Sequence, residues 1–442
     1  MIEIIRYSKA SIRRLRWRSN WPQGMALLVM GLAVPAHVFS APDPRTEFVV
    51  TQFGAVAGGA ALNSAAIQSA IDAAAGRGGG TVVIPAGVFR SGSIFLKAGV
   101  ALRLEAGAVL LGSDNIADYP KQRTRIEGHF EPWRMALINA SNLENLRISG
   151  PGRIDGNGAP FWAAFWQRRA ENKKCTNLEV ERPRLLFLDR CRGVRLENLA
   201  LVNAGFWNIH LYRCTDVLID GVDISVPPFP VRAPSTDGID IDSSQRVTIR
   251  RCRIAVDDDC IALKGSKGPR ADLDEDSPPV EDILVDQCEF ARGNGVMTCG
   301  SEATIVRRAT VRDSRVTGRV VLVCLKLRPD TPQHYEDLLF DGIQFSGGAA
   351  RIFNVAPWTQ FFDLQGLPPP SRTVKNVTVR NLSGAAGSFG VLAGNPGDVL
   401  RDLTVENIQV TLQESALKVG SVEHLAWRDV MVNGQSVGNP VH

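Results

Sequence analysis

The chain has 442 residues, of which 44% are hydrophobic, and its formal net charge is only +4. So small a charge on so long a chain gives no sign of the basic stripe that nucleic-acid-binding proteins carry, and we expect no nucleic-acid partner. The 41 glycines and the aromatic content of 7% favour many short strands joined by tight turns over a bundle of helices.

The first 40 residues have the pattern of a signal peptide. Four arginines between positions 13 and 18 precede an apolar run from Met25 to Val34, and the small residues Ser40 and Ala41 follow. The run is short for a membrane span, so an uncleaved anchor is the weaker alternative. We expect residues 1–40 to be removed. The mature chain, residues 41–442, should then be secreted or periplasmic and independent of the membrane.

The segment from 41 to 145 is expected to cap the main fold and form its first coils. Residues 62–75 have apolar side chains at helical spacing with Asn63 as the expected N-cap, and residues 81–85 read as a strand. A helix here would cover an open sheet end. Two segments rich in tryptophan and charge, 123–134 and 161–183, are predicted insertions that frame a binding cleft.

From residue 194 onward one short pattern recurs nine times. Each copy has apolar strand residues, a polar bend and a further apolar residue, and successive copies begin 22 to 39 residues apart. This repeat predicts an all-β protein, a single-stranded right-handed parallel β-helix with a short N-terminal capping helix. A β-sandwich is disfavoured because the Asp-Gly pairs recur inside the repeat rather than between matched strands.

Eight cysteines in an exported chain suggest disulfides, but their spacing favours another interpretation. Cys252 and Cys288 occupy the same repeat position, and Cys191 and Cys214 each stand three residues before a copy begins. Such stacked cysteines usually serve as small core residues. The disulfide state is left open, and the lack of any CxxC pair argues against a zinc site.

Two acidic clusters, residues 235–242 and 257–259, lie in consecutive copies of the repeat. Asp237 and Asp258 are 21 residues apart, which places them at neighbouring heights on one wall, about 5 Å apart. Carboxylates held so close cannot all ionise cheaply, so at least one pKa should rise. A protonated acid beside an ionised base is what glycosidic cleavage requires.

Two other readings of these carboxylates stay open. Aspartates in solenoid bends often bond nearby backbone N–H groups, and Asp240 and Asp242 fit that role better than a catalytic one. Several carboxylates can also ligate calcium. Residue type alone places catalysis only a little ahead of calcium binding.

Motifs along nearly the whole mature chain resemble one known family. They include residues 53–55, 66–72, 79–87 and 150–158, the segment Ser235-Thr236-Asp237, where the family has Asn-Thr-Asp, and the pair Asp258-Asp259. Together they are similar to glycoside hydrolase family 28, the polygalacturonase-like family of the pectin lyase-like superfamily.

The resemblance implies an inverting glycoside hydrolase that cleaves α-galacturonosyl linkages of pectic polysaccharides and needs neither cofactor nor metal. Asp258 would be the general acid, while Asp237 and Asp259 would position and deprotonate water. Adjacent strand residues point to opposite faces, so Asp258 and Asp259 share a site only if the backbone bends there. We expect a monomer.

The chain departs from the family pattern at two places. Asn294 replaces the histidine of the Gly-His-Gly motif, and Cys324 replaces the arginine of the Arg-Ile-Lys motif. Lys326 is kept and is expected to hold a substrate carboxylate as a point charge. Arg328 would compensate for the lost arginine, Asn294 would hydrogen-bond substrate, and Glu302 would contact sugar. These changes favour an exo-acting galacturonidase or a rhamnogalacturonan hydrolase over a typical endo-polygalacturonase.

Two functions from other classes compete with hydrolysis. A polysaccharide lyase of this fold would need calcium and a basic residue for proton abstraction, and the Asp-Asp motif disfavours it. A catalytically silent carbohydrate-binding solenoid would have little reason to keep three crowded carboxylates. Four tryptophans are expected either to stack on sugar rings or to pack loops on the solenoid: Trp162, Trp166, Trp207 and Trp358.

Overall fold

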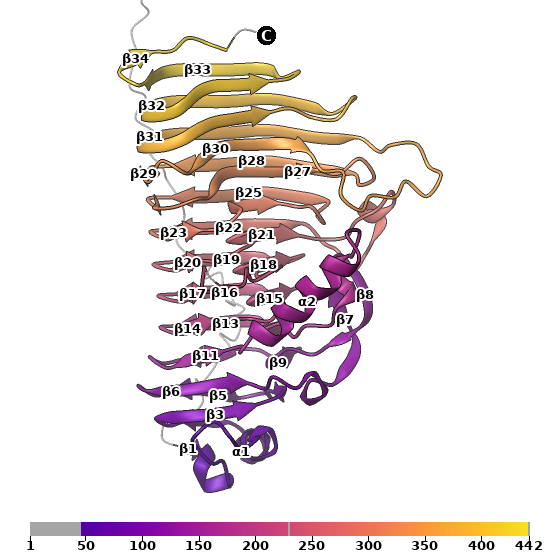
Figure 1. Ribbon diagram of the computed structural model, residues 1–442, viewed down its shortest axis with the longest axis vertical. Helices are drawn as coiled ribbons and strands as arrows, with labels where there is room; N and C mark the ends of the chain where they lie inside the picture. Colours follow the sequence, from indigo (N-terminus) through magenta and orange to yellow (C-terminus); the bar gives the residue numbers. More distant parts are fainter. Residues whose placement is uncertain (1–45, 229, 441–442) are drawn as a thin grey trace, which may run out of the picture. The chain divides into compact units, whose positions relative to one another are not determined.

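The computed structural model describes residues 46–228 and 230–440. Most of their strands belong to one 32-stranded sheet, whose pairings are parallel except that of the last strand. Figure 1 shows the coils as stacked layers that run from α1 (Ser64–Gly76) to β34 (Gln435–Ser436). The predicted right-handed parallel β-helix is confirmed. The expected signal peptide lies outside the described residues.

The first face of the coil contains the repeat found in the sequence. Val194 lies opposite Val217, Val217 lies opposite Val247, and the same register continues through every copy to Leu425. The predicted starts of all nine copies are therefore confirmed. The strands of this face are β1 (Glu47–Val49), β2 (Gly80–Ile84), β5 (Val100–Leu104), β10 (Arg147–Ser149), β13 (Arg192–Glu197), β16 (Thr215–Asp220), β19 (Gln245–Arg250), β22 (Val280–Asp286), β25 (Ile305–Arg312) and β28 (Gln333–Asp341).

A left-handed residue turns the chain from the first face to the second. It stands four positions after each copy begins, as in Asn198 with φ 57° and Arg251 with φ 52°. Gly221 and Gly342 occupy the same place, where the missing Cβ removes the steric cost. The next residue of each copy from Leu199 to Ile408 is buried, which explains the polar-then-apolar signature.

The second and third faces complete each coil. The second consists of β3 (Gly87–Ser91), β6 (Ala108–Gly112), β11 (Arg153–Asp155), β14 (Ala200–Val202), β17 (Asp223–Ser225), β20 (Arg253–Ala255), β23 (Glu289–Arg292), β26 (Arg315–Val316) and β29 (Gln344–Ser346). The third consists of β4 (Ile94–Phe95), β9 (Ile138–Ser141), β12 (Leu186–Asp189), β15 (Ile209–Tyr212), β18 (Ile239–Asp242), β21 (Ile261–Lys264), β24 (Gly295–Cys299), β27 (Val321–Leu327) and β30 (Arg351–Pro357). In the last coils, β31 (Arg372–Leu392), β32 (Val399–Val419) and β33 (Glu423–Val432) run through bends without a break.

The interior of the coil is filled by apolar side chains and by cysteines. All eight cysteines are buried and form no disulfide. Cys252 and Cys288 stand in successive coils at the predicted core position after the first face, and Cys191 and Cys214 stand in successive coils just before that face. Their interpretation as small core residues is confirmed.

The cap helix α1 covers the first coil, and its four predicted inward residues, Ile67, Ala70, Ile71 and Ala74, are buried. Asn63 stands at the N-cap position, as predicted, but its side chain forms no capping hydrogen bond to the helix. It accepts a hydrogen bond from the N–H of Val56 at 2.7 Å and donates to the carbonyl of Arg90 at 3.3 Å. Asn63 is almost fully buried, so it satisfies loop backbone groups that water cannot reach.

Two insertions leave the coil where the sequence predicts them (Figure 1). β7 (Lys121–Ile126) and β8 (His129–Arg134) form an antiparallel hairpin, and α2 (Ala159–Glu171) leads into the 3-10 turn η3 (Asn177–Glu179). Short 3-10 turns also occur at η1 (Val50–Phe53), η2 (Ile116–Asp118) and η4 (Ala271–Leu273). No helix of the described part of the chain has the length and apolar character needed to cross a membrane.

Candidate active site

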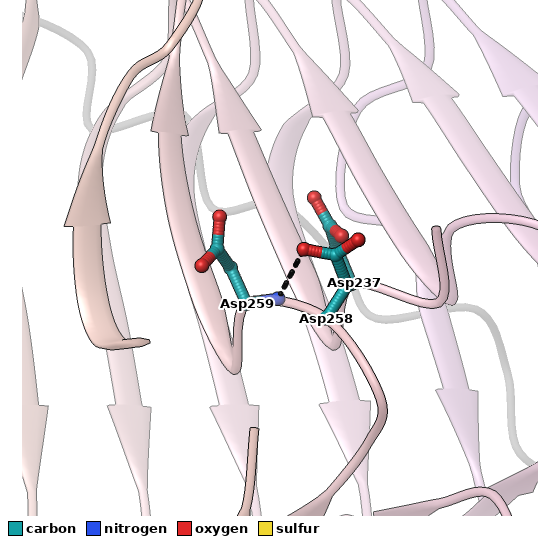
Figure 2. A group of neighbouring side chains, drawn as sticks. All are labelled: Asp237, Asp258 and Asp259. Atoms are coloured by element: carbon teal, nitrogen blue, oxygen red, sulfur yellow. Dashed lines mark hydrogen bonds between the residues drawn. The ribbon is translucent and has the colours of Figure 1, made fainter. Parts of the chain in front are cut away.

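Three aspartates converge where strands of the third face begin. Asp237 stands two residues before β18, and Asp259 stands two residues before β21. Because Ile239 pairs with Ile261, these two aspartates occupy equivalent places on neighbouring coils. The chain bends at Asp257 and Asp258, as the prediction required, and turns the Asp258 carboxylate into the same space (Figure 2). One oxygen from each of the three carboxylates lies within 4.8 Å of the others.

Two glycines allow the coils to approach so closely. A Cβ added to Gly238 would lie 2.4 Å from the Cys260 carbonyl oxygen, and one added to Gly293 would lie 2.4 Å from the Cys260 sulfur. Both distances are shorter than any ordinary contact of carbon with oxygen or sulfur. Gly238 follows Asp237, and Gly293 precedes Asn294. The two positions that require glycine are therefore adjacent to residues of the site.

Asp258 and Asp259 have different hydrogen-bond partners. The Asp258 carboxylate accepts from the Asn294 side-chain amide at 2.9 Å. It also accepts from the backbone N–H of Asp259 at 3.1 Å, which is the bond drawn in Figure 2. The Asp259 carboxylate accepts from the Thr298 hydroxyl at 2.9 Å and from the Lys326 ammonium group at 2.6 Å. Asp259 is thus bonded by a positively charged group, whereas the side chain that bonds Asp258 is a neutral amide.

The protonation of Asp258 is set by burial and by its neighbours. Burial, followed by the charges of Asp237 and Asp259, raises the pKa of Asp258 to about 7, although Lys326 and Lys264 act in the opposite direction. A carboxyl group with this pKa holds a proton through much of the acidic to neutral range. It can therefore donate that proton to a leaving group.

A second lysine, Lys264, lies beside Asp237. Its ammonium nitrogen is 3.3 Å from Asp237, 3.5 Å from Asp240 and 3.6 Å from Glu302. Burial raises the pKa of Asp237, and it raises the pKa of the fully buried Asp240 still further, with the charge of Asp237 adding to the effect. We expect Asp240 to be neutral, so that Lys264 supports the ionised form of Asp237.

These contacts also bear on calcium binding. The three carboxylates offer hard oxygen ligands of the kind that calcium prefers. The ammonium groups of Lys264 and Lys326, however, already lie against Asp237 and Asp259. A divalent cation there would meet two fixed positive charges, which favours the use of these carboxylates in proton transfer.

The carboxylates open into a cleft of about 700 Å³. Both insertions contribute to its wall, as predicted: Glu127 comes from the tip of the β7–β8 hairpin, and Phe165, Trp166 and Arg169 come from α2. The predicted substrate-binding residues Asn294, Glu302, Lys326 and Arg328 all line the same cleft.

Lys326 and Arg328 differ in how much of their charge is available to a ligand. Lys326 lies over the ring of Trp358, 4.8 Å from its centroid, besides contacting Asp259. The Arg328 guanidinium is paired with Asp330 at 2.8 Å and donates to the backbone carbonyl of Phe361 at 2.9 Å. Arg328 thus anchors the loop after β30, and this geometry does not present a free fork to replace the missing family arginine.

Glu302 is almost fully buried and accepts from the Ser301 hydroxyl at 2.8 Å. Burial opposes its charge, but Lys264 and Lys267 hold its pKa well below the usual range. Glu302 is therefore an ionised group that balances Lys264 behind the three aspartates. Oε2 of Glu302 contacts Lys264, and the small exposed part of the side chain lines the cleft.

The four tryptophans lie in two kinds of place. Trp166, Trp207 and Trp358 line the cleft. The indole N–H of Trp162 instead donates to the Ala204 carbonyl at 2.9 Å, and its ring packs α2 on the coil. The Lys264 ammonium nitrogen lies over the Trp207 ring, 4.8 Å from the ring centroid.

Asp240 and Asp242 are structural, but for a reason other than the predicted one. Both lie within strand β18 rather than in a bend, and neither has a backbone N–H partner. Asp242 forms a buried ion pair with Arg125 of the hairpin, with Oδ2 and Nε 3.0 Å apart. The ring nitrogen Nε2 of His210 lies 3.5 Å from Oδ2 of the same carboxylate.

Sequence reasoning did not single out Lys264, Thr298 or Glu127. The alternation of β21 contains the signal for Lys264, because Ile261 and Leu263 face the core and Lys264 must face outward like Asp240. Thr298 and Glu127 carry no such local signal, since one depends on the pairing of β21 with β24 and the other on the fold of an insertion.

Comparison with known proteins agrees with this geometry. Residues 78–428 match the glycosyl hydrolases family 28. A probable polygalacturonase of Vitis vinifera is 33% identical over 428 residues, covering 92% of this chain and 82% of the relative. An exo-poly-alpha-D-galacturonosidase of Dickeya chrysanthemi is 27% identical, covering 79% and 65% respectively.

Solved structures share the fold at lower identity. A hyperthermoactive exopolygalacturonase of Thermotoga maritima superposes with a TM-score of 0.65 at 21% identity, covering 89% of this chain and 93% of its own. A polygalacturonase of Erwinia carotovora gives 0.58 at 21% identity, covering 90% and 99%. The chain is thus a glycoside hydrolase built on a parallel β-helix. It belongs to the glycosyl hydrolases family 28, as its motifs predicted.

Proposed function

We propose that this enzyme hydrolyses α-galacturonosyl bonds of pectic polysaccharide and releases galacturonate from chain ends. The observation that carries the proposal is the convergence of Asp237, Asp258 and Asp259 within 4.8 Å in a cleft that also contains Lys326. The relatives named as polygalacturonase and exo-poly-alpha-D-galacturonosidase support the substrate class.

Asp258 is the proposed general acid. Its pKa of about 7 keeps it protonated at mildly acidic pH, and its side-chain partner is a neutral amide, whereas Asp259 is bonded by the Lys326 ammonium group. The proton of Asp258 passes to the glycosidic oxygen as the bond from that oxygen to the anomeric carbon breaks. The Asn294 amide donates to one Asp258 oxygen, so the proton sits on the other oxygen, which is free to meet the substrate.

Asp237 and Asp259 are the proposed water-activating pair. They stand at equivalent places on neighbouring coils, and each has a lysine ammonium group within 3.3 Å. A water between them would lose a proton to one carboxylate as its oxygen attacks the anomeric carbon. The products are a shortened chain and one sugar with an inverted anomeric centre.

The distance between the carboxylates does not by itself favour inversion. Inverting glycosidases usually hold their two carboxyl groups about 6.5–9.5 Å apart, and retaining ones about 5–5.5 Å. Here one oxygen from each of the three carboxylates lies within 4.8 Å of the other two. The proposal of inversion rests on the family resemblance and on the presence of two carboxylates to orient water.

Release from chain ends is supported by how the cleft is framed. The hairpin tip brings Glu127 into the cleft wall, 3.7 Å from Lys267, and Asn177 of η3 lines the same wall. Two insertions that meet the cleft in this way obstruct a long chain more than a short end. The lost family arginine at Cys324 also separates this chain from typical endo-acting relatives.

Product analysis with matched variants tests the proposal. Wild type, Asp258→Asn and the surface control Asp216→Asn would each be incubated with polygalacturonate, rhamnogalacturonan and short oligogalacturonides in the presence of a chelator. We expect wild type and the control to release saturated monogalacturonate from galacturonan, and Asp258→Asn to lose at least about 100-fold in rate. Unsaturated products, or equal rates in Asp258→Asn, would refute it.

We also propose that residues 1–40 are removed on export and that the mature enzyme acts outside the cytoplasm as a monomer. The basic and apolar pattern of the N-terminus supports export, and so does a polymeric substrate that cannot enter a cell. N-terminal sequencing of the exported protein should give a start near residue 41. A start at Met1 would refute this part of the proposal.

A further inference from the structure

The charges of the cleft are not evenly matched. On the side where the strands of the third face end, its charged groups are already paired: Lys264 with Glu302, Lys267 with Glu127, and Arg328 with Asp330. On the side where the strands begin, the cleft is lined by Arg319 and Arg351. Among the described residues, neither of these arginines has a carboxylate within 4.0 Å. The two sides of the cleft therefore offer a ligand very different charge.

Arg319 and Arg351 belong to consecutive coils just beyond Asn294. The N–H of Gly293 donates to the Arg319 carbonyl at 3.1 Å, and the N–H of Arg351 donates to the Val320 carbonyl at 3.0 Å. Arg319 is thus level with Gly293, whereas Arg351 pairs with Val321, which in turn pairs with Gly295. The two arginines stand on successive coils, one on each side of the position that Asn294 occupies on its own coil. Both are exposed.

Arg319 and Arg351 differ from most arginines on the wall of the coil. Most wall arginines bond a carboxylate of an adjacent coil, as Arg312 bonds Asp286 and Arg308 bonds Asp282. Arg292, on the coil before Arg319, is paired with Asp257 at 2.9 Å. Arg169 and Arg232 also line the cleft without a carboxylate partner, but their side chains donate to the backbone carbonyls of Cys175 and Asp257. Among the described residues, Arg319 and Arg351 are the cleft arginines whose side chains have neither kind of partner.

We propose that Arg319 and Arg351 form a carboxylate-binding subsite for a uronate unit other than the one held by Lys326. Resting on the proposed function, this inference deepens it by naming how a second acidic sugar is recognised. Each guanidinium offers a planar fork that can bond both oxygens of a carboxylate. The subsite would select for free-acid chains and against esterified ones.

Binding measurements test the subsite apart from catalysis. Titration calorimetry would use trigalacturonate and its fully methyl-esterified form as probes. The proteins would be Asp258→Asn, the same variant with Arg319→Ala and Arg351→Ala, and the same variant with the control Arg195→Ala. Arg195 is exposed, also has no carboxylate partner among the described residues, and does not line the cleft.

We expect the double arginine replacement to weaken trigalacturonate binding by about 10-fold or more, because charge-assisted bonds are lost. Binding of the ester should change less than about twofold, and the control should match the parent for both probes. Added salt should weaken the parent more than the double variant. Equal trigalacturonate affinity in parent and double variant would overturn the subsite.

The two proposals fail in distinguishable ways. If wild type releases no galacturonate but the arginine replacements still weaken trigalacturonate binding, the proposed function is wrong and the subsite stands. If wild type releases galacturonate and the replacements leave affinity unchanged, the subsite is wrong and the proposed function stands.

Discussion

At the scale of single residues, the chemistry depends on unequal treatment of three similar carboxylates. Asp259 is bonded by Lys326 and Thr298, whereas Asp258 is bonded by the neutral amide of Asn294. A lysine ammonium group stabilises negative charge far more than an amide does. One carboxyl group is thereby kept as an acid and another as a base, within a few ångströms.

The pH dependence of turnover follows from this difference. Because burial and the neighbouring carboxylates raise the pKa of Asp258 to about 7, the acid is available below pH 7 and lost above it. The value of kcat/KM should therefore fall about tenfold per pH unit above 7.

Asn294→Asp places a negative charge beside Asp258, so the pKa of Asp258 should rise. The pH above which kcat/KM falls should then increase by about 1 unit. If kcat/KM begins to fall at the same pH in both proteins, the assignment of Asp258 as the general acid is contradicted.

The sequence predicted the residues whose motifs are local and missed those that need a register. Asp237, Asp258 and Asp259 stand in short motifs and were found. Arg328 shows the limit of such reasoning, because it does reach the cleft, but its charge is taken by Asp330 two residues further on. The loop conformation decides which acidic residue pairs with a charged side chain, and residue spacing in the sequence does not predict that partner.

At the scale of elements, a buried ion pair joins the β7–β8 hairpin to the coil. Arg125 and Asp242 are each about 1% exposed and join the hairpin to strand β18, while the Arg125 guanidinium also donates to the Ser266 hydroxyl at 3.0 Å. The hairpin tip contributes Glu127 to the cleft. The position of this wall is therefore tied to a contact outside the cleft.

Breaking the pair should destabilise the protein. Arg125→Ala leaves Asp242 buried without its main partner, which should cost about 3–5 kcal/mol in urea unfolding, whereas removing the exposed Arg246 of the Arg246–Asp216 pair should cost about 1 kcal/mol or less. A displaced hairpin should also raise KM in Arg125→Ala. Equal stability of the two variants would mean that the hairpin is held by other contacts.

At the scale of the whole molecule, the repeat made the fold predictable. Left-handed residues such as Asn198 and the inward residues that follow them recur in every copy, so aligning the copies predicted the register of the first face from residue 194 onward. The earlier strands of that face were not aligned in this way. The third face was not predicted strand by strand. Its strands are short and follow insertions of variable length, which erase any fixed period.

The buried cysteines give a test of this core. All eight thiols are free and buried, so the native protein should react slowly with a thiol reagent, and protein unfolded without reductant should show eight reactive thiols. Six or fewer thiols would reveal a disulfide, with Cys252 and Cys288 the first pair to examine by peptide mapping.

The stereochemistry of the first product tests the central claim most directly. Proton NMR would follow the anomeric signals of newly formed galacturonate during the first minutes of oligogalacturonide hydrolysis, before mutarotation mixes the forms. Single displacement of an α-linkage, with Asp258 as acid and water held by Asp237 and Asp259, predicts that the β-anomer appears first. Initial formation of the α-anomer would show that a carboxylate attacks the sugar directly, and would contradict the assigned roles.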